Sequence, residues 1–341
     1  MPFSVRPARL PADYPAIAVV LHAEWSGADT AAELAYADAH REAQYHHAVF
    51  VAEEMSGTEP LLVGVAFVGH DTLAHREGKF AMNLRVHPDW QGQGVGKALY
   101  QAVLAHLPPM TPQELHAFFW YAHPRTLRFL TERGFQEAWR RLDLTLEVTS
   151  FDFTPYHGLE EKLRTQRITV KIYPELAADP ERLHKLYELD WALWQDIPYG
   201  QAVTKRSFAQ FVADEIDHPK FIADACFIAV QDGRFVGYLN LSEGDNDWNT
   251  EMTGVLPAYR GRDVATLLKL YSIRYAQTHG NLPLSTQNDA VNQADACPVG
   301  YLTPTGFHRA SRFTPNTTRI PLGNFFLAYR LGLVAGNLLR F

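Results

Sequence analysis

The segment LRVHPDWQGQGVG, at residues 84–96, reads as the end of an apolar strand, a proline, and a glycine-rich turn that leads into a helix. Its glycines, Gly92, Gly94 and Gly96, stand at every second position just before Lys97. Glycine lets the backbone bring several N–H groups to one anion, and the start of a helix adds the positive end of its dipole. The segment therefore predicts a binding site for the pyrophosphate of a cofactor.

Two common nucleotide-binding loops fit the segment poorly. A dinucleotide-binding loop needs the spacing G-x-G-x-x-G and an acidic ribose ligand about 20 residues later, and residues 106–113 offer no strand with such a carboxylate. A Walker loop needs a hydroxyl residue after the lysine, where this chain has Ala98. The order Val-x-Pro-x-x-Gln-Gly-x-Gly-x-Gly, which begins at Val86, instead resembles motif A of the GNAT acyltransferase superfamily. In that family the loop binds the pyrophosphate of acetyl-CoA.

The pattern recurs roughly 170 residues later in the chain, which indicates an internal repeat. Val255–Gly261 repeats the Val-x-Pro-x-x-[Gln/Arg]-Gly frame, and the pair Gly134–Phe135 returns as Gly306–Phe307. Two hairpin patterns, at 49–66 and 226–239, are separated by a similar interval. We therefore identify the chain as a tandem GNAT protein, whose organisation resembles that of mycothiol synthase. The resemblance implies a mixed α/β fold with two acyl-CoA N-acyltransferase domains.

The length of 341 residues fits two domains, each able to bury its own core. We expect an N-terminal GNAT domain at 1–155, a linker with a short charged helix at 156–167, a C-terminal GNAT domain with an altered loop at 168–320, and an apolar tail at 321–341. The uncharged run of the tail is shorter than the roughly 18 residues that a membrane span requires. We expect the tail to pack on the C-terminal domain or across a homodimer, with binding to a membrane surface as the alternative.

The composition of the chain limits the kinds of partner that it is expected to bind. The net charge of −7 argues against a nucleic-acid groove, because phosphate binding draws on a basic excess, and it suits a cationic small-molecule amine. The two cysteines, Cys226 and Cys297, form no disulfide framework, and the first residues lack the pattern of a signal peptide. We expect a cytoplasmic protein that binds no metal ion.

The resemblance also implies how acetyl-CoA is held. In the family, the strand that here ends at Val86 pairs through its backbone with the pantetheine arm, and a bulge in it turns an N–H toward the thioester oxygen. The expected cofactor contacts are Leu84, Arg85, Val86, Gln91, Gly92, Gln93, Gly94, Val95, Gly96 and Lys97.

Acetyl transfer needs a neutral amine, a stabilised oxyanion and a proton for the departing thiolate. The family often places a tyrosine donor four residues before the Gly-Phe pair, but this chain has Leu130 and Leu302 there. His123 stands where the family commonly has an asparagine, and a histidine can move protons near neutral pH. The alternative is an idle, solvated residue at the start of a helix, beside Pro124.

The second repeat departs from the pattern in its loop and adds a carboxylate. Asp263 replaces the middle glycine, where it would either repel a pyrophosphate or cap the following helix. Glu251 precedes Val255 by four residues, a place where many family members have a glutamate that accepts the amine's proton directly or through water. Its alternative is a solvated surface carboxylate near Asp245 and Asp247.

We expect the first repeat to bind acetyl-CoA and the second to shape the substrate pocket. Aromatic residues of the second repeat would then line that pocket or belong to its core: Trp191, Trp194, Tyr199 and Trp248. The leading hypothesis is an acetyl-CoA-dependent N-acetyltransferase that acts on the amine of a small molecule. The alternative is a non-catalytic acyl-CoA-binding sensor, suggested by the two leucines that replace the usual tyrosine.

Overall fold

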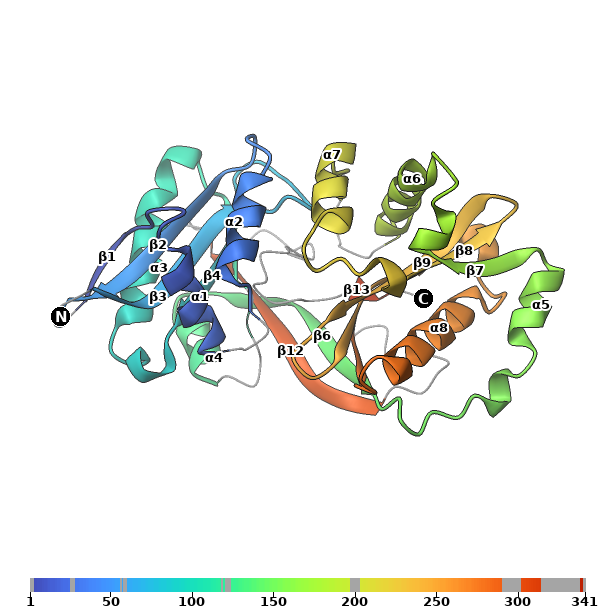
Figure 1. Ribbon diagram of the computed structural model, residues 1–341. Helices are drawn as coiled ribbons and strands as arrows, with labels where there is room; N and C mark the ends of the chain where they lie inside the picture. Colours follow the sequence, from blue (N-terminus) through green and yellow to red (C-terminus); the bar gives the residue numbers. More distant parts are fainter. Residues whose placement is uncertain are drawn as a thin grey trace. The chain divides into compact units, whose positions relative to one another are not determined.

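The computed structural model divides into two compact units (Figure 1). Unit 1 comprises Met1–Trp139, Tyr199–Arg206 and His308–Ala335, and unit 2 comprises Arg140–Pro198, Ser207–Phe307 and Gly336–Phe341. The structure describes residues 3–24, 28–55, 57, 60–117, 119, 124–196, 203–289, 302–313 and 338–339. Among these residues, no helix combines the length and the apolar character needed to cross a membrane.

Unit 1 is a mixed sheet with helices on both faces. Its strands, in spatial order, are β1 (Phe3–Pro7), β2 (His47–Glu54), β3 (Leu61–His70), β4 (Lys79–Val86), β5 (Glu114–Ala117) and β12 (Leu302–Phe313). Its helices are α1 (Tyr14–His22), α2 (Ala31–Ala39), α3 (Val95–His106) and α4 (Pro124–Thr131). Neighbouring strands are antiparallel except for the parallel pair of β4 and β5.

Alternate residues of β3 enter two different cores, as expected for a strand that is buried on both faces. Ala66 and Val68 belong to the core that α3 covers, whereas Val65 and Phe67 belong to the core of α1 and α2. Val95 of α3 belongs to the first core, and Val86 and Trp90 pack against it, so the loop between β4 and α3 lies at the edge of this core.

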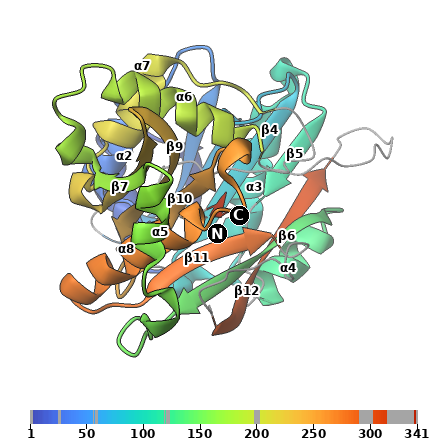
Figure 2. The same cartoon turned by 90° about the vertical axis from the view of Figure 1, so that its right-hand side faces the viewer.

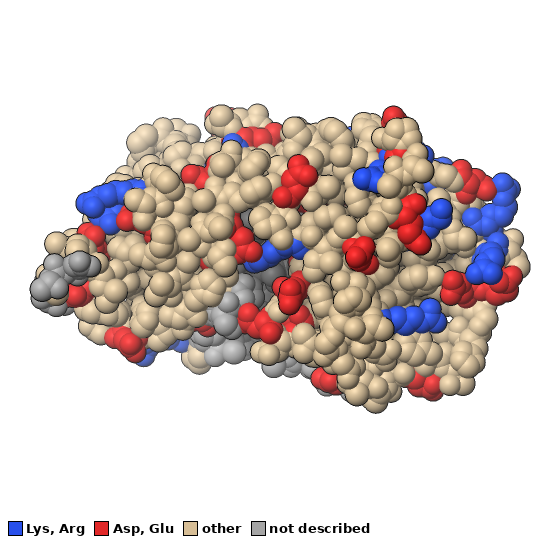
Figure 3. Space-filling view, in the orientation of Figure 1, with Lys and Arg blue, Asp and Glu red and all other residues tan. Residues whose placement is uncertain are grey.

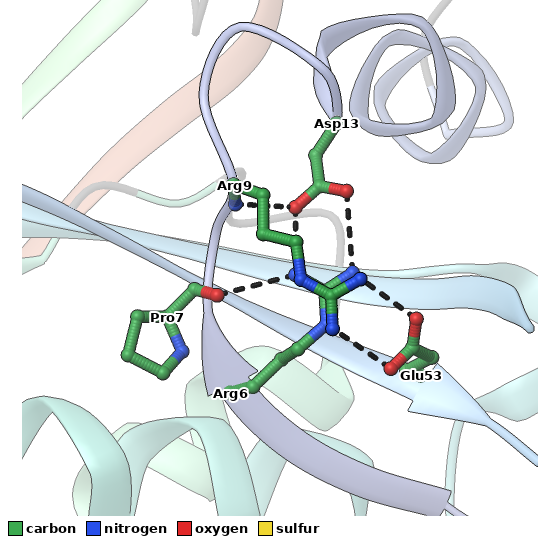
Figure 4. Close-up of polar contacts among 5 residues, drawn as sticks. All are labelled: Arg6, Pro7, Arg9, Asp13 and Glu53. Atoms are coloured by element: carbon green, nitrogen blue, oxygen red, sulfur yellow. Dashed lines mark hydrogen bonds and ion pairs between the residues drawn. The ribbon is translucent and has the colours of Figure 1, made fainter.

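An arginine holds the start of α1 against the sheet (Figure 4). Arg6 on β1 donates to Asp13 at 2.7 and 3.2 Å and to Glu53 on β2 at 3.0 and 3.1 Å. Asp13 also accepts from the backbone N–H of Arg9 at 2.6 Å. The hydrogen bonds from Arg6 keep the pKa values of both carboxyl groups below their usual range. This network ties the residue that precedes α1 to the first two strands of the sheet.

Unit 2 repeats this architecture. Its strands, in spatial order, are β6 (Gln136–Leu146), β11 (Leu284–Asp289), β10 (Trp248–Val255), β9 (Arg234–Glu243), β8 (Cys226–Gln231) and β7 (Ile168–Ile172). Its helices are α5 (Leu159–Thr165), α6 (Arg182–Trp194), α7 (Phe208–Phe211) and α8 (Val264–Thr278). Short 3-10 or π turns across both units are Pro88–Trp90, Pro108–Met110, Thr154–Tyr156, Tyr173–Leu176, Val212–Ile216, Ala223–Ala225 and Pro257–Tyr259.

The last strand of each repeat pairs within the unit built mainly from the other repeat. β6 follows α4 in the chain but pairs with β11, from Leu284↔Leu146 to Asp289↔Arg141 (Figure 2). β12 follows β11 but pairs with β5 at Ser311↔His116 and Phe313↔Leu115. The borders of the compact units therefore fall inside β6 and β12, while the repeat border at 155–168 remains a prediction about the sequence.

Two parts of the chain outside the repeats also have described structure. The helix expected in the linker forms as α5 and packs against β7 and α8. In the apolar tail, Leu338–Leu339 forms the short strand β13, which pairs in parallel with Met252 and Thr253 of β10.

Candidate functional site

The glycine-rich loop of unit 1 has the backbone that its sequence predicts. β4 ends at Val86, a 3-10 turn follows, and α3 begins directly after Gly94. Gly92 and Gly94 have φ values of 80° and 92°, in the left-handed region that side chains disfavour. The loop thus brings backbone to the start of α3 without side chains at these two positions, as an anion site requires.

A cavity of about 490 Å³ lies at this loop. Its lining comes from the end of β4, the loop, the first turn of α3, and α4. Eight of the ten expected cofactor contacts line it: Leu84, Arg85, Val86, Gln91, Gly92, Gly94, Gly96 and Lys97. The other two face elsewhere, since Val95 is buried in the core of α3 and Gln93 donates to the Asp89 carbonyl at 2.8 Å.

The cavity lining is predominantly basic. Its cations are Arg85, Lys97, Arg125, Arg128 and Arg133, and its carboxylates are Glu24 and Glu132. Elsewhere, the face shown in Figure 3 carries charges of both signs side by side. A basic concavity at the start of a helix fits a polyanionic ligand.

A network of polar side chains closes one end of the cavity. Glu24, which follows α1, forms an ion pair with Arg85 Nε at 3.3 Å and accepts from Gln91 Nε2 at 3.5 Å. Gln91 Nε2 also donates to the Val86 carbonyl at 3.2 Å, and its amide oxygen accepts from Arg125 at 3.3 Å. Burial lowers the pKa of Arg85, and the charge of Glu24 opposes this shift. Sequence analysis missed Glu24, because only the folded chain brings the end of α1 to the end of β4.

The expected bulge in β4 is absent. The register of β3 and β4 runs without a shift from Gly64↔Val86 to His70↔Phe80. A bulge occurs instead in β10, between Thr250 and Thr253, where the Asn240 side chain accepts from the backbone N–H of Met252 at 3.0 Å. Phe67 stands at the place of Asn240 in unit 1 and offers no such acceptor. The expectation of a bulge in the strand that ends at Val86 was therefore wrong.

Among the described residues, the pairing of β4 with β5 covers only part of β4. The parallel ladder between the two strands runs from Lys79↔Glu114 to Met82↔Ala117. β4 continues to Val86, and its last residues line the cavity. Leu84–Val86 thus lies at the cavity, and its backbone contacts with a ligand remain a prediction.

The corresponding loop of unit 2 is built differently. Asp263 precedes α8 with a φ of 66°, and its carboxylate lies 2.7 Å from Lys162 Nζ of α5. Asp263 stands at the N-cap position of α8, one of the two alternatives considered for it, but its side chain makes no capping hydrogen bond. The pairing with a lysine of the same chain also reduces the repulsion that a bare carboxylate would exert. By alignment on Val255, Thr253 corresponds to Leu84, and Thr253 is paired with β13.

Sequence comparison matches both units to one family. A model of the acetyltransferase (GNAT) domain matches residues 33–137, and a model of the acetyltransferase (GNAT) family matches residues 182–297. The chain belongs to the GNAT acetyltransferase family. It contains two GNAT domains in tandem, as the repeat predicts. No curated protein sequence matches the chain significantly.

Solved GNAT structures share this tandem fold. A GCN5-related N-acetyltransferase from Sphaerobacter thermophilus matches over 95% of this chain and 98% of its own, with a TM-score of 0.59 and 17% identity. A tandem GNAT protein from the clavulanic acid biosynthesis pathway matches over 93% and 100%, with a TM-score of 0.66 and 14% identity. A glucosamine N-acetyltransferase region of a fungal multi-domain β-N-acetylglucosaminidase matches over 91% of this chain and 38% of its own, with a TM-score of 0.61 and 14% identity.

Of the two residues expected to transfer protons, only Glu251 is described, and it does not line the cavity. Glu251 is half-buried on β10 of unit 2, where it accepts from the Ser242 hydroxyl, and it is not among the lining residues. His123 lies outside the described residues. Leu130 is buried and lines the cavity at the place where many GNAT enzymes have a tyrosine. Leu302 begins β12 and so does not lie on a helix.

Of the four aromatic residues singled out in the second GNAT domain, Trp248 lies in the core. Trp248 is buried in the core of unit 2, and its indole N–H donates to the His279 carbonyl at 3.0 Å. Trp191 and Trp194 are half-buried on α6, and Tyr199 lies outside the described residues. Trp248 is thus a core residue, which was the alternative to lining a substrate pocket.

Proposed function

We propose that this GNAT protein is an acetyl-CoA-dependent N-acetyltransferase that acts on the amine of a small molecule, with unit 1 as the cofactor domain. The observation that carries the proposal is the cavity at the Gly92–Gly96 loop. Backbone with positive φ, the start of α3 and five basic side chains converge there. Together these groups match a ligand that carries a pyrophosphate.

Different parts of the cavity lining would bind different parts of the cofactor. The loop backbone and Lys97, in the first turn of α3, would hold the phosphates, and the edge of β4 at Leu84–Val86 would pair with the pantetheine arm. Buried Leu130, with Leu84 and Met82, supplies an apolar wall beside the acyl group. When bound, acetyl-CoA supplies an activated acyl group. An amine that is held against this end of β4 in its neutral form could attack the thioester carbon.

In this proposal unit 2 does not bind the cofactor. Asp263 and Lys162 pair at the start of α8, and β13 pairs with the segment of β10 that corresponds to the ligand-facing end of β4. Proton acceptance by Glu251, directly or through water, and proton movement by His123 remain proposals. So do a location in the cytoplasm and a homodimer.

A non-catalytic acyl-CoA sensor is the second candidate. It is favoured by Leu130, because an apolar residue in the place of a phenol cannot protonate the departing thiolate. Release of thiol from acetyl-CoA, measured across a panel that includes glucosamine, putrescine, tyramine and lysine, separates the two. Acceleration of thiol release by an amine supports the transferase, and tight acetyl-CoA binding without accelerated release with any of these amines supports the sensor.

A further inference from the structure

In unit 2, a segment from the C-terminal part of the chain lies along the end of β10. Among the described residues, the parallel ladder of β10 with β11 covers only the first two residues of β10, although the strand continues to Val255. Leu338–Leu339 forms β13, which pairs in parallel with Met252 and Thr253 of β10 and also contacts β11. β13 therefore takes over as the neighbour of β10 where the ladder with β11 ends.

The corresponding place in unit 1 is the candidate cofactor cavity. There the ladder of β4 with β5 also covers only part of β4, and the residues beyond it, Leu84–Val86, line the cavity. In the alignment of the two repeats, Thr253 corresponds to Leu84, and Thr253 is the residue opposite Leu339 of β13. A segment of the chain itself thus lies in unit 2 where unit 1 has a cavity.

The strands beside β13 carry hydroxyl groups without partners. Thr250 and Thr253 on β10 and Thr286 on β11 are 0, 0 and 3% exposed, and none of their hydroxyls has a hydrogen-bond partner among the described residues. A buried polar group without a partner is unfavourable, because it has lost its hydrogen bonds to water. The leucine side chains of Leu338–Leu339 cannot supply such a partner, whereas the amide-bearing arm of coenzyme A could.

We propose that unit 2 contains a second acyl-CoA site, and that Leu338–Leu339 of the same chain closes it by lying in the place of the cofactor. The inference rests on the proposed function, because it takes acetyl-CoA as the ligand of the cavity in unit 1. Two contacts close the site: β13 covers the end of β10, and Lys162 pairs with Asp263 at the start of α8. Release of both contacts should allow unit 2 to bind acetyl-CoA.

The test releases the two contacts separately in the full chain. The double variant Leu338→Pro/Leu339→Pro removes both backbone N–H groups of β13. Asp263→Gly removes the carboxylate at a residue whose φ of 66° suits glycine, and so takes the partner from Lys162. The double variant Leu338→Val/Leu339→Val is the matched control for the prolines, because it keeps the N–H groups and apolar side chains that favour strands.

Hydrogen exchange, read by mass spectrometry, measures the cover over β10 without any cofactor. The proline pair should speed exchange of the segment 248–255 at least about tenfold, because its amides lose the pairing with β13. The valine pair should exchange like the wild type. Slow exchange of the β8 segment 226–231 in all variants shows that unit 2 is still folded. Unchanged exchange of 248–255 in the proline pair would show that β13 does not cover β10.

Calorimetric titration with acetyl-CoA then counts the sites. We expect one site per chain in the wild type and in Asp263→Gly, where β13 remains in place. We expect two sites when Asp263→Gly is combined with the proline pair, and one when it is combined with the valine pair. In the first combination, acetyl-CoA should slow exchange of the segment 248–255 again, which places the second site at β10.

The outcomes separate this inference from the proposed function. If neither the wild type nor any variant binds acetyl-CoA, both fail. If every variant has one site, although exchange at 248–255 is faster in the proline pair, this inference alone is overturned. Two sites in Asp263→Gly alone, with 248–255 still protected, would also overturn it, and this result needs no proline variant.

Discussion

Gly94 and Asp263 occupy the same place in the two units, since each is the residue immediately before a helix that follows the Val-x-Pro turn, and each has a positive φ. The backbone turn is thus conserved between the units, while the chemistry at its centre is not. Gly94 leaves its cavity open, whereas the carboxylate of Asp263 pairs with Lys162. This difference underlies the division of labour proposed for the two units.

One acetyl-CoA should bind per chain. We expect the affinity of unit 2 to be at least roughly tenfold weaker than that of unit 1, because its loop has lost a glycine and the matching edge of β10 pairs with β13. Calorimetric titration gives the stoichiometry directly. Two equivalent sites per chain would show that Asp263 does not impair the second loop.

Glu251→Gln tests the proton acceptor proposed for the second unit. If Glu251 accepts the amine's proton, directly or through water, kcat should fall about 10²-fold or more while acetyl-CoA affinity stays the same. The acidic limb of the wild-type pH profile should also disappear, because an amide does not titrate. Ser242→Ala is the matched control, since it removes only the hydroxyl that donates to Glu251. Full activity and an unchanged limb in Glu251→Gln would leave Glu251 a structural carboxylate.

The stability of unit 1 should fall as the pH drops below about 6.5, the ordinary pKa of histidine. Burial lowers the pKa of His47 to about 3, and its Nε2 atom is buried without a hydrogen-bond partner. Burial also lowers the pKa values of His46 and His70. Because the unfolded chain binds these protons first, each such histidine contributes a slope of up to about 1.4 kcal/mol per pH unit below 6.5.

Urea unfolding between pH 5 and pH 8 measures this dependence. His47→Phe should flatten the slope, because it removes the group that must stay neutral in the folded state. The exposed His157 provides the control, and His157→Phe should leave the slope unchanged. Equal slopes for the wild type and His47→Phe would contradict the assignment.

The local features of the fold were readable from the sequence because they depend on neighbouring residues. The loop at 84–96, the helix within 159–165 and the second copy of the pattern each follow from spacing and from glycine or proline chemistry. The exchange of β6 and β12 was not predictable, since a strand has the same apolar pattern whichever sheet it joins. The missing bulge in β4 was not predictable either, because the register of β4 is a property of its pairing with β3 across the sheet.

In the candidate site, too, residues that are close in the sequence were predicted and residues that meet only in the fold were not. Eight cavity residues lie in one continuous segment and were predicted, whereas Glu24 lies some 60 residues earlier in the chain and meets Arg85 only in the folded chain. The partner of Asp263 was missed for a similar reason. Lys162 lies on a helix that the sequence marks only as a charged linker.

The measurement that bears most directly on unit 1 as the cofactor domain is the calorimetric titration of acetyl-CoA into the wild type, Gly94→Ala and Gly94→Asp. Both variants place a side chain at a φ of 92°, so the alanine variant measures backbone strain and the aspartate variant adds a negative charge. We predict that Gly94→Asp binds acetyl-CoA at least roughly tenfold more weakly than Gly94→Ala, because its carboxylate faces the pyrophosphate. Wild-type affinity in a folded Gly94→Asp protein would contradict the account and place the cofactor elsewhere.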